Sequence, residues 1–226
     1  MPAHAKGPRI SGVNSAGLRI GILGGSFNPA HEGHLHITML ALKHLELDQV
    51  WWMVSPQNPL KSEEDMAPLA DRMSSAETIA GKNTRILVTD IETRLNTRYT
   101  SSTLRALLTA FPYTRFIWLM GADNLQQIPR WEKWTFIFRM VPIAIFDRAT
   151  YSFKALASKA AHRFQRYRVR PRNAASIVGK SPPAWVYFHS TLHPASGTEI
   201  RASRHKKSGA KSNKTSNSNK TLRGKK

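Results

Sequence analysis

Two glycines and two histidines gather in one short run near the start of the chain, Gly24-Gly25-Ser26-Phe27-Asn28-Pro29-Ala30-His31-Glu32-Gly33-His34. Glycine has no Cβ, so its backbone can approach a ligand closely and can take a positive φ. His31 and His34 lie three residues apart, so a helix that begins near Gly33 would turn both rings toward one place. Each imidazole donates a hydrogen bond to a phosphate oxygen, and the first N–H groups of a helix favour an anion. The run therefore predicts a phosphate site.

A metal site and a plain surface turn are the alternatives for this run. A zinc site built from His31, His34 and Glu32 would need a further ligand, and no convincing one lies nearby in the sequence. A glycine turn followed by ordinary surface histidines would leave both rings without a chemical role. The run contains neither the Gly-Lys-Ser/Thr of a P-loop nor the Gly-x-Gly-x-x-Gly of a dinucleotide-binding loop.

The elements that must position these residues can be predicted from apolar periodicity. We expect strands near residues 19–23, 50–54, 85–89, 116–120, 141–146 and 185–189, and helices near residues 34–45, 68–80, 101–111, 131–139 and 152–167. Strands that are almost continuously apolar are typical of a parallel sheet covered on both faces. The sequence thus predicts a single α/β domain over residues 18–203, with a Rossmann-like doubly wound parallel sheet. Ligands of such sheets bind beyond the carboxyl ends of the strands, and the glycine–histidine run follows the first strand.

Positive charge is concentrated toward the end of the chain. The 226 residues have a formal net charge of +20, and residues 204–226 hold nine Lys or Arg and no Asp or Glu. Their Lys, Ser, Asn and Gly content predicts a disordered basic tail, and the Gly, Pro, Ser and Ala content of residues 1–17 predicts a flexible arm. A nucleic-acid-binding protein is therefore one open class, with non-specific contact through the tail. No helix-turn-helix, zinc or RNA-binding pattern supports it, and a basic body also suits polyphosphate substrates.

The chain has no cysteine, which excludes disulfides, thiolate metal sites and cysteine nucleophiles. This composition is consistent with a reducing cytoplasm, where we expect the protein to reside. No apolar run reaches the roughly 18 residues that a membrane span requires, and the first residues do not resemble a secretory signal. We expect no membrane contact.

The complete glycine–histidine run resembles the Gly-Gly-(Ser/Thr)-Phe-(Asp/Asn)-Pro-x-His-x-Gly-His motif of the HxGH superfamily of adenylyl- and cytidylyltransferases. That resemblance implies that a substrate phosphate attacks the α-phosphate of a nucleoside triphosphate without a covalent enzyme intermediate. By the same resemblance, His31 and His34 hold the triphosphate and stabilise charge in the transition state, while Gly24, Gly25, Ser26 and Phe27 line the phosphates.

Two further segments resemble bacterial nicotinate-mononucleotide adenylyltransferases in particular. Met120-Gly121-Ala122-Asp123-Asn124-Leu125 and the Pro129-Arg130-Trp131-Glu132 that follows are similar to a segment of that family, as is Tyr99-Thr100-Ser101-Ser102-Thr103-Leu104. The resemblance implies that Asp123 orients ribose hydroxyls or metal-bound triphosphate, and that Thr100, Trp131 and Glu132 bind nicotinate. If Trp131 opens a helix, its ring can stack on a pyridine while helix N–H groups meet the carboxylate.

Phosphate contacts are also implied near the end of the domain. Ala195-Ser196-Gly197-Thr198-Glu199-Ile200-Arg201 resembles the family's C-terminal Ile-Ser-(Ser/Ala)-Thr-x-Ile-Arg motif, which implies a catalytic Arg201 and phosphate contacts from Ser196 and Thr198. After the second strand many relatives carry Pro-Pro-His-Lys, but this chain has Asn58-Pro59-Leu60-Lys61. Lys61 is retained as a phosphate contact, and the role of the missing histidine does not transfer.

The resemblance covers about residues 19–203 and implies a specific reaction. ATP, with Mg²⁺ held mainly by its phosphates, would adenylylate nicotinate mononucleotide to give nicotinate adenine dinucleotide and pyrophosphate, in NAD biosynthesis. No dedicated protein metal site is expected. Nicotinamide mononucleotide and pantetheine phosphate stay open as alternative acceptors, and the segment from Asp123 to Trp131 argues against the second of these.

Overall fold

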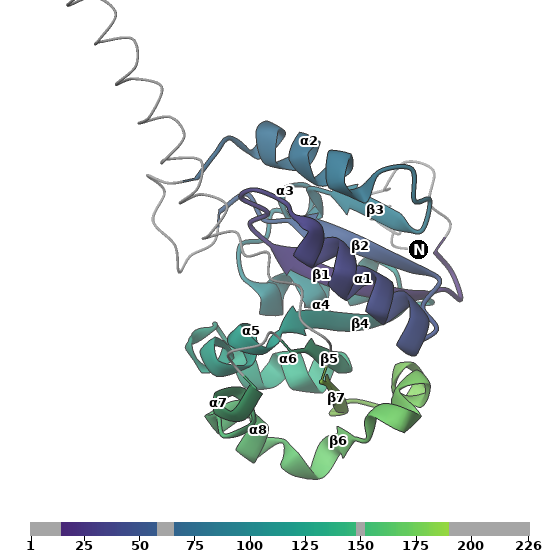
Figure 1. Ribbon diagram of the computed structural model, residues 1–226, viewed down its shortest axis with the longest axis vertical. Helices are drawn as coiled ribbons and strands as arrows, with labels where there is room; N and C mark the ends of the chain where they lie inside the picture. The colour runs from purple at the N-terminus through teal and green to yellow at the C-terminus, as the bar shows by residue number, and fades with distance from the viewer. Residues whose placement is uncertain (1–14, 58–65, 148–151, 190–226) are drawn as a thin grey trace, which may run out of the picture.

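The computed structural model describes residues 15–57, 66–147 and 152–189. Within these residues seven parallel strands form one sheet in the order β3-β2-β1-β4-β5-β7-β6 (Figure 1). The strands are β1 (Arg19–Gly25), β2 (Gln49–Val54), β3 (Ile86–Thr89), β4 (Arg115–Gly121), β5 (Ile143–Phe146), β6 (Arg168–Val169) and β7 (Trp185–Phe188). Successive strands step outward from β1 in one direction and from β4 in the other. The carboxyl ends of β1 and β4 therefore form the switch point at which such sheets bind ligands.

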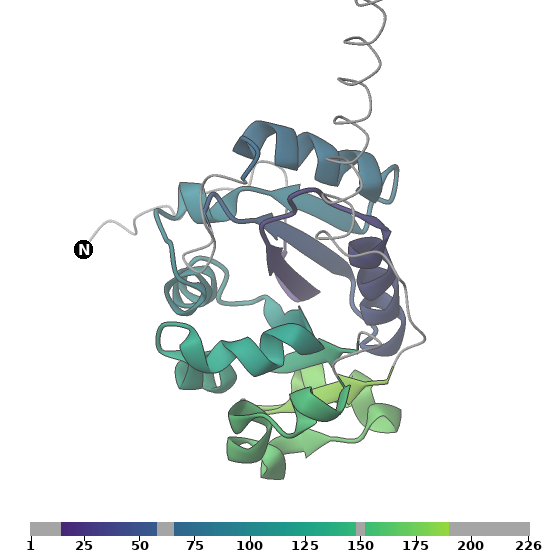
Figure 2. The same cartoon turned by 60° about the vertical axis from the view of Figure 1, so that its left-hand side comes forward.

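Helices cover both faces of this sheet. They are α1 (Glu32–His44), α2 (Leu69–Ala80), α3 (Ile91–Arg94), α4 (Thr100–Ala110), α5 (Ala122–Gln127), α6 (Trp134–Met140), α7 (Ser152–Leu156) and α8 (Lys159–Arg163), with 3-10 segments η1 (Ile128–Arg130), η2 (Gln165–Tyr167) and η3 (Pro171–Gly179). One core cluster joins the sheet to α1, α2 and η3, and a second joins its opposite face to the other α-helices. In Figure 2 the dark purple α1 lies on one side of the strands and teal helices lie on the other. The predicted doubly wound sheet is confirmed.

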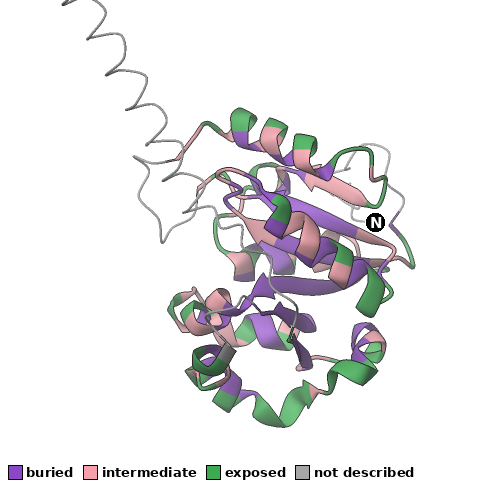
Figure 3. Ribbon diagram, viewed as in Figure 1, coloured by how far each residue is buried: buried purple, intermediate pink, exposed green. Residues whose placement is uncertain are grey.

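The inner strands of the sheet are largely buried, because nearly every side chain along them is apolar. Large aromatic side chains fill the space on either face, among them Trp51, Trp52, Trp118 and Trp185, which are at most 2% exposed. Figure 3 shows buried strands between helices whose outer surfaces are exposed. This pattern supplies the apolar burial that stabilises a domain of this size.

Two predicted helices differ from the observed elements. The helix expected over residues 131–139 begins only at Trp134, because Lys133 takes a left-handed conformation with φ of 47°. The helix expected over 152–167 is divided into α7, α8 and η2. The division occurs at Ser158, whose hydroxyl accepts from the N–H of Ala161 and starts a new helix. The short α3 and α5, which follow β3 and β4 directly, and the elements β6 and η3 were not predicted.

The last residues of the predicted flexible arm pack against the domain. Ser15 is 4% exposed, and its carbonyl and hydroxyl oxygens both accept from the hydroxyl of Thr114, at 2.8 and 2.9 Å. The N–H of Gly17 donates to the carbonyl of Tyr113. The rest of the arm and the whole basic tail lie outside the described residues. No helix among the described residues is both long and apolar enough to span a membrane.

Candidate active site at the switch point

The glycine–histidine run forms the loop between β1 and α1, at the carboxyl end of the sheet. His31 is the N-cap of α1, and its Nδ1 accepts from the N–H of Gly33 at 3.1 Å. The Nδ1 of His34 accepts from the N–H of His31 at 3.2 Å. The two rings are 4.0 Å apart between centroids. The structure thus brings both histidines together at the start of a 13-residue helix.

These two contacts decide which ring nitrogen carries the hydrogen. Each Nδ1 accepts a hydrogen bond, so in the neutral ring the hydrogen must be on Nε2. Each Nε2 is therefore a donor, and both donors belong to the positive end of the α1 dipole. The loop can present two N–H donors and a helix start to an anion without protonation of either imidazole.

The conformation of this loop depends on Phe27 more than on its glycines. Phe27 has a φ of 46°, whereas neither Gly24 nor Gly25 has a positive φ. The Phe27 ring is buried and lies 4.6 Å from the ring of His34 and 5.4 Å from that of Trp52. Neither glycine therefore uses the positive φ that glycine allows. A Cβ on Gly24 would lie 2.4 Å from Cη2 of Trp118, so Gly24 is required by packing, while a Cβ on Gly25 would meet only ordinary contacts.

A buried arginine that the sequence analysis missed holds this loop in place. Arg72 on α2 is 2% exposed, and its guanidinium donates to the carbonyl oxygens of Ala67, Ser26, Ser55 and Pro56 at 2.6 to 2.9 Å. Ser26 belongs to the loop after β1, and Ser55 and Pro56 follow β2. Burial lowers the pKa of the Arg72 guanidinium, which stays charged because arginine does not deprotonate in proteins. The sequence does contain a sign of this role. Arg72 lies four positions before Ala76 and eight before Ala80, so helical spacing places this charged residue on the buried face of α2.

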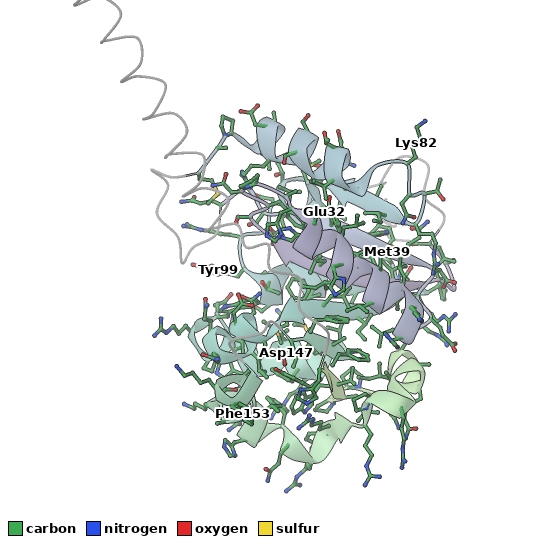
Figure 4. All side chains as sticks on the ribbon, in the orientation of Figure 1. Glu32, Met39, Lys82, Tyr99, Asp147 and Phe153 are labelled. Atoms are coloured by element: carbon green, nitrogen blue, oxygen red, sulfur yellow. The ribbon has the colours of Figure 1, made fainter. Side chains whose placement is uncertain are left out.

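The predicted acceptor residues lie on the opposite face of the sheet from α1. Thr100 is the first residue of α4, an 11-residue helix whose N-cap is Tyr99. Figure 4 labels Tyr99 at this helix start and Glu32 at the start of α1. Trp131 is half-buried, and its ring makes an edge contact with that of Trp118 at 6.4 Å.

The expectation that Trp131 opens a helix is wrong. Trp131 closes η1, and its N–H donates to the carbonyl of Ile128 at 2.9 Å. The backbone N–H of Trp131 is therefore already used, and the helix that follows begins only at Trp134. The N-terminus of α4, at Thr100, is therefore the helix start near Trp131 that can bind a carboxylate on a pyridine ring.

Glu132 connects the turn after Trp131 to α4. Its carboxylate accepts from the hydroxyl of Ser101 at 3.0 Å and contacts the ammonium of Lys133 at 2.9 Å. The Lys133 ammonium, and after it the Ser101 hydroxyl, lower the pKa of this carboxyl group. An ionised carboxylate with these partners repels an anionic substrate, so its geometry fits the positioning of the Trp131 turn better than direct nicotinate contact.

A buried carboxyl group lies behind the start of α4. Glu92 is 3% exposed, its carboxylate accepts a hydrogen bond from the hydroxyl of Thr103 at 3.1 Å, and the hydroxyl of Ser55, which donates to the carbonyl of Gln57, lies nearby. Burial raises the pKa of Glu92, and the two hydroxyls lower it by a smaller amount. Since Ser55 also contacts Arg72 through its carbonyl, buried polar contacts run from the loop after β1 to α4.

The remaining predicted residues divide into one described residue and several that lie outside the description. Asp123 is the second residue of α5 and follows β4 at the switch point, where it is half-buried. Outside the described residues lie Lys61, Ser196, Thr198 and Arg201. Within the described part of the chain, no group of three His, Asp or Glu side chains could hold a metal ion.

Comparison with known proteins identifies the family. The cytidylyltransferase-like family model matches residues 22–203. A probable nicotinate-nucleotide adenylyltransferase of Parvibaculum lavamentivorans is 50% identical over 185 residues, which cover 82% of this chain and 92% of that protein. The chain belongs to the nicotinate-nucleotide adenylyltransferase family. A member of that family from Caulobacter sp., also named as probable, is 46% identical over 81% of this chain and 97% of its own length.

Solved structures show that the fold of this family member is shared more widely. Plasmodium falciparum nicotinic acid mononucleotide adenylyltransferase, solved in complex with APC and in complex with NaAD, aligns with a TM-score of 0.59. The alignment covers 82% of this chain and 83% of that chain at 17% sequence identity. At this identity the similarity establishes the fold.

Proposed function

We propose that this protein transfers the adenylyl group of ATP to nicotinate mononucleotide, giving nicotinate adenine dinucleotide and pyrophosphate as a step of NAD biosynthesis. The observation that carries this proposal is the pair of Nε2 donors of His31 and His34 at the start of α1, in a chain of this family. The relatives' name and the complexes of the Plasmodium protein with APC and NaAD support the choice of substrates.

The reaction is a displacement at the α-phosphorus of ATP. A phosphate oxygen of the mononucleotide forms a bond to that phosphorus, and the bond between the α-phosphorus and the oxygen bridging to the β-phosphate breaks. Pyrophosphate leaves with the electron pair of that bond. In this proposal the Nε2–H groups of His31 and His34 stabilise the charge on the phosphates, so the protein acts by positioning and by fixed electrostatics.

The other triphosphate contacts follow from the same loop and from the family resemblance. Gly24, Gly25, Ser26 and Phe27 bring the backbone of the loop close to the phosphates, while Arg72 fixes its course. We assign Asp123 to ribose hydroxyls or to the metal-bound triphosphate. Lys61, Ser196, Thr198 and Arg201 complete the phosphate contacts in this assignment.

Mg²⁺ fits this site as an ion that arrives with ATP. Mg²⁺ keeps several waters and is usually bound by one or two carboxylates together with substrate phosphates, and Asp123 at the end of β4 supplies a carboxylate of that kind. When bound, the ion would neutralise phosphate charge. The loop, the two histidines and the helix start orient the triphosphate around it.

The acceptor would lie on the α4 side of the switch point. We assign Trp131 to stacking on the pyridine ring and Thr100, at the start of α4, to the nicotinate carboxylate. Glu132 holds the turn that carries Trp131. The helix start and a hydroxyl both donate to an anion, whereas an amide NH₂ would face donors that cannot accept from it.

The test is an assay of pyrophosphate release with ATP, Mg²⁺ and a panel of acceptors: nicotinate mononucleotide, nicotinamide mononucleotide and pantetheine phosphate. We expect dinucleotide formation, with kcat/KM at least about tenfold higher for the acid than for the amide, or ~1.4 kcal/mol. Thr100→Val should reduce use of the acid more than use of the amide. Equal use of both mononucleotides would contradict the nicotinate assignment, and no turnover with any acceptor would contradict adenylyl transfer itself.

A further inference from the structure

A strongly basic surface lies at one end of the sheet, on elements that the proposed reaction does not use. Residues 152–189 contain eight Lys or Arg and no Asp or Glu, and all eight side chains are exposed. We call this surface the basic edge. Its cations are Lys154, Lys159, Arg163, Arg166, Arg168, Arg170, Arg172 and Lys180. Figure 1 shows α7, α8 and β6 at the lower end of the molecule, with the light-green η3 to their right, and these helices flank this end of the sheet on its two faces.

The charges of the basic edge are not neutralised within the described part of the chain. None of the eight side chains forms an ion pair with a described residue. Arg168 lies over the rings of Trp185 and Tyr187, with its guanidinium carbon 5.4 and 5.7 Å from their centroids. A cluster of like charges raises the energy of the folded state by repulsion. An anionic partner would remove that cost.

The backbone arranges several of these cations in a row. Arg168 and Arg170 are extended residues two positions apart, so their side chains leave on one side with a separation of about 6.6 Å. Arg166 precedes them and Arg172 follows. Among the described strands β6 is the last in the sheet, so no further strand covers its outer side. The row can therefore contact a chain of evenly spaced anions.

We propose that the basic edge binds single-stranded nucleic acid through its phosphate backbone. A phosphodiester chain is uniformly anionic, which matches a surface without acidic residues, whereas a protein partner usually presents both signs of charge. Five of the eight cations are arginine, whose planar fork suits phosphate. A membrane surface fits less well, because a helix that lies in the membrane interface buries a broad apolar face and α7 has only five residues.

Exposed aromatic side chains favour single strands over duplexes. Phe153, which Figure 4 labels, is 92% exposed and precedes Lys154 in the sequence, and Tyr167 is 39% exposed between Arg166 and Arg168. Unpaired bases stack on such rings, while the bases of a duplex are already stacked. The part of the basic edge on β6 is also separate from the loop after β1, since β6 lies four strands away from β1 in the sheet, about 19 Å at the usual strand spacing.

The experiment measures binding of the full chain to fluorescent 20-nucleotide uridine and thymidine homopolymers over a range of salt concentrations. The test variant is Arg166→Gln, Arg170→Gln, Arg172→Gln, which leaves Arg168 on its aromatic partners. The control variant is Lys43→Gln, Lys82→Gln, Arg115→Gln, which removes the same charge from exposed positions elsewhere. Both variants should keep the adenylyl-transfer rate of the parent protein.

We expect the test variant to bind at least about tenfold more weakly at low salt. The slope of log K against log salt should fall by about two, because each phosphate contact to a single strand contributes about 0.7. The control should change affinity less than about threefold. Phe153→Ala should weaken binding at least about fivefold relative to Tyr113→Ala, a matched exposed aromatic.

Four results would overturn the proposal. They are equal losses in the two triple variants, an unchanged affinity in the test variant, equal affinity for a duplex of the same length, and binding to vesicles of anionic phospholipid without binding to either homopolymer. The first two results would show that another part of the chain binds the nucleic acid. The last two would show that the partner is not a single-stranded nucleic acid.

Discussion

At the scale of single residues, the most informative contact is the one between the N–H of His31 and Nδ1 of His34. It fixes the ring and gives Nε2 the hydrogen without any requirement for a protonated imidazole. A side chain oriented in this way loses little freedom when an anion binds. The backbone of the N-cap residue His31 therefore prepares His34 for charge stabilisation before a substrate arrives.

Replacement of His34 should separate catalysis from folding. We expect His34→Ala to lower kcat by about two to three orders of magnitude, or about 2.7–4 kcal/mol, as for the loss of an oxyanion donor. The melting temperature should change little, since His34 is only half-buried. Steady-state kinetics and thermal unfolding are the measurements, with His36→Ala on the same helix as the control. A variant that loses stability and activity in parallel would show that His34 is structural.

Arg72 belongs to the same scale because one guanidinium joins backbone segments that follow two different strands. Arg72→Lys keeps the charge but offers three donors at one nitrogen instead of a planar fork, so it cannot serve four carbonyls. We expect kcat to fall at least about tenfold and KM for ATP to rise, while KM for nicotinate mononucleotide changes less than about threefold.

The kinetics of Arg72→Lys should be measured well below its melting temperature, beside Arg139→Lys, an exposed arginine on α6. A general loss of structure would reduce the active fraction and leave both KM values unchanged. That result, or a wild-type kcat, would contradict a positioning role for Arg72.

At the scale of elements, the turn that carries Trp131 depends on α4 through one hydrogen bond. Ser101→Ala removes the donor to Glu132, a bond to a charged group that contributes about 1.5–3 kcal/mol when it is well formed and less when part-exposed. We expect KM for nicotinate mononucleotide to rise roughly threefold to tenfold and KM for ATP to stay nearly constant. Ser102→Ala, at the next and exposed position of α4, is the matched control. Equal effects of the two substitutions would contradict this link.

The elements also show what the sequence can and cannot predict. The six longer strands were placed within about two residues because continuous apolar runs such as Phe116–Met120 need no tertiary information. The start of α6 was misplaced because the left-handed turn at Lys133 has no signature in residue type. The cap at Ser158 did have one, since serine is a preferred N-cap, and it was missed inside a helical pattern.

The sequence predicted those parts of the candidate site whose residues are neighbours along the chain. It did not predict the contacts between residues that are far apart in the sequence. His31 and His34 are close in sequence, so their proximity follows from helix geometry. Arg72 reaches Ser26 across 46 positions, and Glu132 reaches Ser101 across 31. Apolar periodicity does not predict these two contacts, because they depend on how the strands are ordered in the sheet.

At the scale of the whole molecule, stability should depend on pH through Glu92. Its pKa is raised above the ordinary 4.5, mainly by burial. The native state therefore holds this proton more tightly than the unfolded state does. The stabilisation is fully present below about pH 4.5 and is lost as pH rises through the raised pKa. Glu92→Gln, which cannot ionise, should therefore gain in melting temperature relative to the parent protein as pH increases.

The measurement is thermal unfolding of both proteins between about pH 4 and pH 8, with Glu77→Gln on the exposed side of α2 as the control. The difference between Glu92→Gln and the parent should grow with pH, and that of the control should stay flat. A constant difference across the range would show that Glu92 ionises in the folded protein as freely as in the unfolded chain.

The strand order also sets the sequence in which the sheet can assemble as the ribosome makes the chain. β1 is synthesised first, yet it lies between β2 and β4, and its partner Arg115 emerges long after Arg19. Until then β1, β2 and β3 can pair, but the edge of β1 that later receives β4 has unpaired backbone groups. A nascent chain that pauses before β4 thus displays an apolar sheet edge, the kind of surface that molecular chaperones protect.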